Sequence, residues 1–526
     1  MAKTWDSAAA DTRGWLAATG ILAAAVVLAA TRTCGIGLTP DSICYVSAAR
    51  HLLAGEGYVL YDNSPYVLWP PLFPALLAFV GFFGVDPLVG ARYANALLFG
   101  LIVFLTGSLI ERHARAQWLS VPGAALVLLS APLLLVSFNA LSEPLFTFLA
   151  MASLGLIARP DSRRMGYSFF FAAAIAALAF LTRYLGCVLI GACLLTLLAR
   201  ARKWPFRAAF QGGVFAAISV GPTALWLARN YALTSSLAGR RFPPPLTAWG
   251  NTLALLEAVA QCFLPEALPP WVKIGALVAG AAAAVAALYA CGIKVHSHIW
   301  KTAATPMFTV MALFAALYGA ALVALASWTG FDRISLRLLA PAAPPAIVAA
   351  AILCDQMAAG VSPAARRRLF CLLAAMFFPA IAGSAFRTAL WVKNRMADGA
   401  GGYATVDWRR SEMANYLAKN DIGGALYCND PRALYILAGK ASLLSPRKLS
   451  YTGAALSKEE DEAAALPFAG ALRESGGVCV IWFDGIRDEQ LCGIEAIAAK
   501  FACSVETVRR FPDGAIYRVS ARGKQR

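Results

Sequence analysis

Charged side chains stand at a few positions between long apolar segments of this chain, and Asp41 is the first that could do chemistry. It lies in Pro40-Asp41-Ser42, just beyond the first apolar segment. A carboxylate beside a bilayer is costly, so it calls for a functional explanation. Asp41 could act as a general base that takes a proton from an acceptor hydroxyl. The alternative is a helix N-cap, because a helix is expected over residues 43–53 and Asp caps helices well.

A second carboxylate, Glu143, lies in the short connection Ser142-Glu143-Pro144 between two apolar segments. Together with Asp41 it could bind a divalent cation, or it could bind an acceptor. The alternative is a glutamate at a helix start, where the helix dipole favours a negative charge. The four histidines form no cluster, and His296 and His298 are expected in a loop. The sequence therefore leaves a metal site open.

Three arginines are the candidate anion-binding groups. Arg183 interrupts an apolar run, where a cation needs an anion, water or carbonyl groups. A lipid phosphate would satisfy it, because a guanidinium group binds phosphate through paired hydrogen bonds. A structural ion pair with a membrane carboxylate such as Glu143 is the alternative. Arg229 and Arg337 flank other apolar segments, and for each of them the alternative is snorkelling at the interface.

The composition identifies an integral membrane protein. The chain has 526 residues, of which 59% are hydrophobic and 14% are charged, and its mean hydropathy is +0.63. Soluble domains are typically about 45–50% apolar. The net charge of +17 is explained by Lys and Arg in short loops, as the positive-inside rule requires. No stretch has the pattern of a nucleic-acid binder.

The hydropathy pattern predicts an α-helical polytopic membrane protein with about eleven transmembrane helices. Segment 69–84 is shorter, begins near Pro70-Pro71, and is expected to be a juxtamembrane or re-entrant helix in the first outer loop. If the basic loops are cytoplasmic, the N-terminus is cytoplasmic and the candidate site residues lie on the outer side. The expected spans are 15–33, 91–110, 119–138, 141–158, 167–182, 185–199, 207–227, 271–292, 303–328, 336–354 and 370–390.

The tail is more polar and is expected to form a small extracytoplasmic α/β domain over 395–526, after a transmembrane domain over 1–394. Its predicted helices are 407–419, 431–438 and 488–501, and its predicted strands are 425–428 and 478–483. A disulfide is possible in an oxidising compartment, but its pairing cannot be read from the spacing. The tail cysteines are Cys428, Cys479, Cys492 and Cys503.

Several short motifs occur in order along the chain. They are Pro40-Asp41-Ser42 with Tyr45, Leu52-Leu53-Ala54-Gly55-Glu56-Gly57, Trp69-Pro70-Pro71-Leu72-Phe73-Pro74, Ser142-Glu143-Pro144-Leu145-Phe146, Leu181-Thr182-Arg183-Tyr184 and Trp226-Leu227-Ala228-Arg229-Asn230-Tyr231. In this order they resemble C-type membrane glycosyltransferases of the protein-mannosyltransferase-like group, which includes the lipid A aminoarabinose transferases. The resemblance covers about residues 15–340, and the tail has no part in it.

The resemblance implies a polyprenyl-phosphate sugar donor, chemistry at the outer membrane face and inversion at the anomeric carbon. It implies that Asp41 is the catalytic base or an acceptor-binding carboxylate. It also implies that Arg183, Arg229 and Arg337 hold the lipid phosphate, with Tyr184 beside them. Some members of the family bind a divalent metal.

The sequence departs from the family pattern at two positions. Ser42 stands where many relatives carry a second acid, and Trp69 stands where some carry a charge. Glu56 or Glu143 is a candidate replacement for the missing acid. Both departures leave the metal and the donor sugar open.

The expected partners are a polyprenyl-phosphate-linked sugar, a cell-envelope acceptor (a lipid, glycan or protein) and membrane lipid, with no nucleic acid. A bacterial plasma membrane, with undecaprenyl or decaprenyl phosphate as the lipid, fits the outer-face site. The alternatives are a lipid or sugar transporter or flippase and a non-catalytic scaffold of envelope assembly. A transporter would show paired halves with broken helices, and the sequence shows none.

Overall fold

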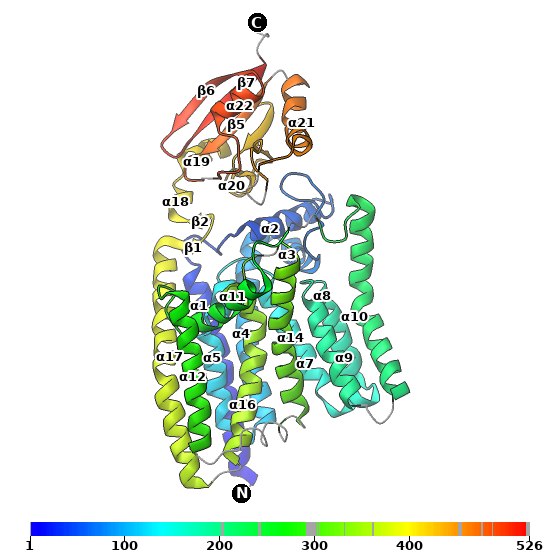
Figure 1. Cartoon of the computed structure of the whole chain (residues 1–526), viewed down its shortest axis with the longest axis vertical. Helices are drawn as coiled ribbons and strands as arrows, with labels where there is room; N and C mark the ends of the chain where they lie inside the picture. Colours follow the sequence, from blue (N-terminus) through cyan, green and yellow to red (C-terminus); the bar gives the residue numbers. More distant parts are fainter. Residues whose placement is uncertain are drawn as a thin grey trace. The chain divides into compact units, whose positions relative to one another are not determined.

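The computed structural model of the chain divides into two compact units (Figure 1). Residues Met1–Ile36 and Val67–Ala397 form one, here called the helical unit, and Gly37–Tyr66 and Asp398–Arg526 form the other, here called the α/β unit. The structure describes residues 2–200, 205–239, 243–290, 302, 305–330, 332–359, 362–450, 455–474, 477–486 and 488–521. The expected loop with His296 and His298 lies outside these ranges.

The helical unit contains long apolar helices joined by short connections. Its α-helices are α1 (Ala2–Ala30), α3 (Leu72–Phe82), α4 (Pro87–His113), α5 (Ser120–Leu128), α6 (Ala131–Ser137), α7 (Glu143–Ile157), α8 (Tyr167–Phe180), α9 (Gly186–Arg200), α10 (Pro205–Thr234), α11 (Ala248–Gln261), α12 (Pro270–Ala290), α14 (Pro306–Trp328), α15 (Leu336–Leu339), α16 (Ala343–Ala359) and α17 (Pro363–Asp398). Short 3₁₀ turns are η1 (Gln117–Leu119), η2 (Pro160–Arg164) and η3 (Ala340–Ala342).

These helices confirm a polytopic membrane protein. Among the described residues, 6 helices are long and apolar enough to cross a bilayer, or up to 7 if the bent pair of η1–α5 and α6 is one span. Helices occur at all the segments predicted to cross, but α7, α8 and α9 are short. A helix of 15 residues such as α7 rises about 22 Å, less than the roughly 30 Å of a hydrocarbon core. The count of about eleven spans therefore stays a prediction.

Segment 69–84 forms only α3, which has 11 residues and is too short to cross a bilayer. The Pro-Pro turn before it explains the late helix start, because a residue that precedes a proline is disfavoured in the helical conformation. Its length fits the juxtamembrane or re-entrant helix that the sequence predicts, and its place in the first outer loop stays a prediction.

Small residues bring the helices of the membrane region close together. A Cβ atom on Gly100 of α4 would stand 2.7 Å from the carbonyl oxygen of Gly20 of α1, and one on Gly107 would stand 2.4 Å from a methyl carbon of Leu16. Such close backbone approach is typical of membrane helices, whose association depends on packing rather than on the hydrophobic effect.

The α/β unit is built around a five-stranded sheet with strand order β4-β3-β5-β7-β6. Strand β3 is parallel to β4 and β5, whereas β7 is antiparallel to β5 and β6. The strands are β3 (Ala425–Cys428), β4 (Leu443–Leu444), β5 (Val478–Phe483), β6 (Cys503–Phe511) and β7 (Gly514–Ala521), and a separate ribbon pairs β1 (Gly399–Gly401) with β2 (Ala404–Thr405). The helices are α2 (Pro40–Leu53), α18 (Val406–Arg409), α19 (Glu412–Lys419), α20 (Pro431–Ala438), α21 (Lys458–Glu474) and α22 (Ile494–Lys500).

Helices cover both faces of this sheet, because its strands alternate apolar side chains to each side. Helices α19 and α20 share one core with Cys428 and Ile481, and α21 and α22 share the other with Tyr427 and Val480. The sequence predictions of 425–428, 431–438 and 478–483 match β3, α20 and β5 residue for residue.

The four tail cysteines are buried free thiols in this structure. Cys428 lies in the core under α19 and α20, whereas Cys492 and Cys503 lie in the core on the opposite face. The sheet therefore separates Cys428 from these two thiols. Among the described residues, none of these four tail cysteines forms a disulfide.

Candidate functional site

The turn between α8 and α9 presents Arg183 where the apolar run breaks. Gly186 makes the turn possible, because a Cβ atom there would stand 2.4 Å from the Cα atom of Phe180. The Leu181 carbonyl accepts a 2.9 Å hydrogen bond from the N–H of Leu72. The Pro-Pro turn before α3 and the arginine turn are therefore joined through their backbones, although they are far apart in sequence.

Glu143 is the first residue of α7, and its side chain is fully buried. Pro144 follows it in the first turn, as the sequence pattern predicts. The buried side chain of Asn95 holds the preceding loop, since its Nδ2 donates to the carbonyl oxygens of Asn139 at 2.7 Å and Leu141 at 3.3 Å. This loop is therefore fixed from helix α4.

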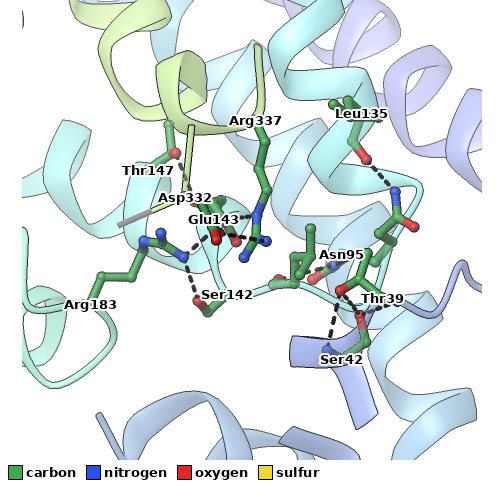
Figure 2. A network of polar contacts seen from close by, with 12 residues as sticks. Thr39, Ser42, Asn95, Leu135, Ser142, Glu143, Thr147, Arg183, Asp332 and Arg337 are labelled. Carbon is green, nitrogen blue, oxygen red and sulfur yellow. Dashed lines mark hydrogen bonds and ion pairs between the residues drawn. The ribbon is translucent and has the colours of Figure 1, made fainter. Parts of the chain in front are cut away.

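Arg183 and Arg337 meet on the Glu143 carboxylate, and Figure 2 shows the two guanidinium groups approaching it from different sides. Nε of Arg337 lies 2.6 Å from Oε1 of Glu143, and Nη1 of Arg183 lies 3.0 Å from the same oxygen. Arg183 also donates to Oγ of Ser142 at 3.2 Å. The structural pairing considered for Arg183 is therefore present, and Arg337 extends it. We call Glu143, Arg183 and Arg337 the charged triad.

The charged triad carries one negative and two positive charges. Oε2 of Glu143 is buried and makes no hydrogen bond among the described residues, and the arginine side chains are 13% and 20% exposed. Asp332 lies 3.9 Å from Arg337, but it is 75% exposed and therefore contributes little. The remaining positive charge is chemically suited to an oxyanion such as a lipid phosphate.

A divalent metal does not fit Glu143. Two guanidinium groups already neutralise this carboxylate, so a cation beside it would meet two like charges. No group of three His, Cys, Asp or Glu side chains suited to a metal is found in the described part of the chain.

Tyr318 of α14 is a neighbour of the charged triad that the sequence analysis missed. Its ring lies 6.3 Å from the ring of Phe146 of α7, and the charges of Arg183, Glu143 and Arg337 act on its hydroxyl. The hydroxyl is buried and has no hydrogen-bond partner among the described residues. A tyrosine in an otherwise apolar helix indicates a polar site nearby, because a buried tyrosine hydroxyl usually has a hydrogen-bond partner.

Arg229 is not among the partners of Glu143. Its guanidinium lies 4.5 Å from the ring centre of Trp226 and donates to Oδ1 of Asn230 at 3.0 Å. Tyr184 follows Arg183 in the turn, and its carbonyl oxygen accepts from the N–H of Cys187 at 3.3 Å. The neighbouring arginines 240 and 241 lie outside the described residues.

Asp41 lies in the first turn of α2, in the α/β unit, and is half-buried. The N-cap is Thr39 and not Asp41, so the capping alternative is wrong. The Thr39 side chain accepts from the N–H of Ser42 at 3.3 Å, and Ser42 Oγ accepts from the N–H of Thr39 at 3.1 Å. Since this capping box satisfies the helix start without Asp41, its carboxylate is not needed as a cap.

Glu56 lies beyond the end of α2, with an exposed side chain paired with His51. Its N–H donates to the carbonyl oxygen of His51 at 2.9 Å. Glu56 and Asp41 therefore belong to the same α/β unit but stand at opposite ends of α2.

The fold is similar to that of two solved membrane proteins, as the sequence resemblance implied. The structure is similar to that of ArnT from Cupriavidus metallidurans bound to undecaprenyl phosphate, with a TM-score of 0.60 and 14% identity over 96% of this chain and 98% of that chain. The apo state of the same ArnT matches with 15% identity and the same TM-score of 0.60.

A second neighbour is archaeal. The oligosaccharyltransferase AglB from Archaeoglobus fulgidus, in complex with an inhibitory peptide and a dolichol-phosphate, matches with a TM-score of 0.53 and 12% identity, over 89% of this chain and 69% of that chain. No protein-family model matches the sequence, and no curated protein matches it. The likeness is therefore one of fold.

Proposed function

We propose that this protein is a membrane glycosyltransferase that moves a sugar from a polyprenyl-phosphate donor to a cell-envelope acceptor at the outer face of the membrane. The observation that carries the proposal is the shared fold over 96% of the chain with an ArnT structure that holds undecaprenyl phosphate. The charged triad adds to this support, because it offers two arginines to a phosphate.

Arg183 and Arg337 are the proposed phosphate-binding residues. Each guanidinium can give paired hydrogen bonds to phosphate oxygens, and Glu143 holds both groups in place. Their charge stabilises the lipid phosphate as it leaves, which lowers the barrier. Arg229 and Tyr184 remain proposed donor contacts, and Glu56 remains a proposed substrate contact and a candidate for the missing acid.

Asp41 is the proposed general base. The acceptor oxygen or nitrogen attacks the anomeric carbon, and its proton passes to the Asp41 carboxylate. The bond between the anomeric carbon and the phosphate oxygen breaks, and the electron pair leaves with the lipid phosphate. A single displacement of this kind inverts the anomeric centre. The leaving group is already a phosphate, so the step needs no nucleotide.

The proposed location is a bacterial plasma membrane, with the N-terminus in the cytoplasm and residues 395–526 outside. The basic loops between the apolar segments support this orientation. An outer-face site also fits a lipid-linked donor, because nucleotide sugars are scarce there. The donor panel described next distinguishes a hexose from a pentose as the transferred sugar.

The test is sugar transfer in membranes from a panel of radiolabelled polyprenyl-phosphate sugars. We expect the wild-type protein to label a product from one donor, and Asp41→Ala and Asp41→Asn at matched abundance to lose it. Asp86→Asn is the control. Asp86 is the N-cap of α4 and accepts from the N–H of Leu88 at 2.9 Å, and Asn caps equally well.

Near-full transfer by Asp41→Asn would overturn the base role. Failure of the wild-type protein with every donor in the panel would favour a flippase. The flippase alternative is tested by measuring the movement of a labelled lipid across the bilayer of proteoliposomes.

A further inference from the structure

Asp41 is covalently part of the first loop, but it folds with the end of the chain. Leu38, three residues before it, is held between two residues of the C-terminal segment. Its N–H donates to the carbonyl oxygen of Gly401 at 3.2 Å, and its carbonyl oxygen accepts from the N–H of Tyr403 at 3.1 Å. The backbone leading into α2 is therefore fixed by residues about 360 positions later in the sequence.

This backbone contact requires a glycine at position 402. Gly402 has φ +60, and a Cβ atom there would stand 1.8 Å from the carbonyl oxygen of Leu38. No side chain fits at that distance, and the partner is backbone that cannot rotate away. Any other residue at 402 would push the two segments apart.

The other end of the 37–66 segment contacts α20. The rings of Tyr61 and Tyr435 are 6.3 Å apart, and the Arg50 guanidinium lies 5.9 Å from the ring centre of Tyr435. Such aromatic and cation–π contacts are individually small. They nevertheless give the segment a second set of contacts with the C-terminal part of the chain.

A charged group held by Asp430 is connected to the first of these contacts through Tyr403. Asp430 is the N-cap of α20 and is only 4% exposed. Its Oδ1 accepts from both the backbone N–H and Nε of Arg432, each at 3.1 Å, and Oδ2 accepts from the hydroxyl of Tyr403. Asp430 therefore joins Arg432 of α20 to Tyr403, whose backbone N–H holds Leu38.

The charge of Arg432 acts on two groups of the first-loop segment. One is the thiol of Cys44, on which Asp41 also acts, and the other is the hydroxyl of Tyr61. Burial raises the pKa of the Cys44 thiol well above its usual range, with Asp41 as the second cause. Cys44 is thus a native reporter, one helical turn from Asp41.

We propose that the C-terminal segment positions Asp41 for proton transfer, through the Leu38–Gly402 contact before α2 and through Arg432, which holds Asp430 and with it Tyr403 beside that contact. Arg432 is in this view a positioning residue and does not touch the reacting atoms. The inference rests on the proposed function for the role of Asp41. It assigns a task to a region that the family resemblance did not reach.

The experiment compares Gly402→Ala with Gly439→Ala in membranes. Gly439 is a matched control, because it has φ +68 in the same unit but open space around its Cβ position. Both variants place an alanine at a positive φ, which strains the backbone in each. Only Gly402→Ala also separates Leu38 from the C-terminal segment. Arg432→Gln and Arg432→Lys form a second pair, for the case that Gly402→Ala does not fold.

Two readouts are taken from each variant: kcat and KM for transfer, and the rate of Cys44 modification by a maleimide. We expect Gly402→Ala to lower kcat about 100-fold, the scale of a 1 Å misplacement, with an unchanged donor KM and faster Cys44 modification. Arg432→Gln should act in the same direction, and Arg432→Lys should restore part of kcat.

The proposal is overturned if Gly402→Ala matches Gly439→Ala in kcat, or if Arg432→Gln matches the wild type. The rate of Cys44 modification does not depend on transfer activity. It therefore still tests whether the C-terminal segment holds residues 37–66 if the proposed function fails. In that case, equal Cys44 modification in Gly402→Ala and Gly439→Ala would show that the C-terminal segment does not hold the loop.

Discussion

Glu143 accepts a 2.6 Å hydrogen bond from Nε of Arg337, although 194 positions separate the two residues in sequence. Arg183 reaches the same carboxylate oxygen from the turn between α8 and α9. The three charges thus join α7, α15 and that turn. Each charge is buried or nearly so, and each is compensated only while the others are present.

Removal of the Glu143 carboxylate is expected to destabilise the helical unit. Glu143→Ala leaves two arginines without their shared anion, and breaking a buried ion pair in this way costs about 3–5 kcal/mol. The measurement is thermal unfolding of purified protein in detergent. The double variant Glu143→Ala/Arg337→Ala should lose less than the sum of the single variants. Additive losses would show that the pair is not coupled.

Arg337→Lys is expected to weaken donor binding with little loss of stability. Lysine keeps the charge, but it lacks the planar fork that can bind Glu143 and a phosphate together. We expect KM for the polyprenyl-phosphate donor to rise about tenfold, equivalent to about 1.4 kcal/mol. Arg333→Lys is the control, because Arg333 is 70% exposed and pairs with Glu257 at 3.3 Å. An equal rise in both variants would argue against a specific phosphate contact.

The thiol of Cys44 is expected to resist maleimide between about pH 7 and 9 in the wild-type protein. Burial, and then Asp41, raise its pKa, so the reactive thiolate is scarce at pH values where a free cysteine ionises. Since the folded pKa is above the unfolded one, the stabilisation that this thiol provides is complete below about pH 8.5 and declines as the pH rises further. The reactivity of Cys44 is measured as its rate of maleimide modification, followed by mass spectrometry. Rapid modification at pH 7 would contradict the assigned burial.

Tyr318→Phe is expected to leave the helical unit as stable as the wild type or slightly more stable. Its hydroxyl is buried without a hydrogen-bond partner among the described residues, and such a group costs about 1–3 kcal/mol. Thermal unfolding in detergent, without donor, is the measurement. A clear loss of stability would mean that the hydroxyl has a partner in the free protein.

Local signals in the sequence explain which elements could be predicted. Helix α20 was placed correctly because Asp430 and Pro431 mark its start and Gly439, in the left-handed conformation, marks its end. The predicted helix over 407–419 is interrupted instead, because Ser411 caps α19 through its side chain. The helix over 488–501 begins only at Ile494, since the preceding residues form a turn in which Asp488 accepts from the N–H of Gln490 at 2.9 Å.

Contacts between residues far apart in the chain could not be predicted from the sequence. Strands β6 and β7 were missed because residues such as Arg509 and Arg510 interrupt the expected apolar alternation. The meeting of Arg337 with Glu143 depends on tertiary packing, although the partner of Arg183 was correctly named as an alternative. The contact of Asp430 with Tyr403 also depends on tertiary packing, since 27 positions separate the two residues.

The division of the α/β unit between two distant segments also bears on how the protein is made. Residues 37–66 leave the ribosome early, but the residues that hold them, from 398 onward, follow only after all the membrane helices. The first loop therefore has no folding partner from its own unit until Asp398 and the residues after it have been made. A transfer site built on Asp41 would stay idle throughout membrane insertion. The rate of Cys44 modification can be compared in arrested nascent chains that end before and after residue 403. A drop in this rate would show the chain length at which the first loop becomes buried.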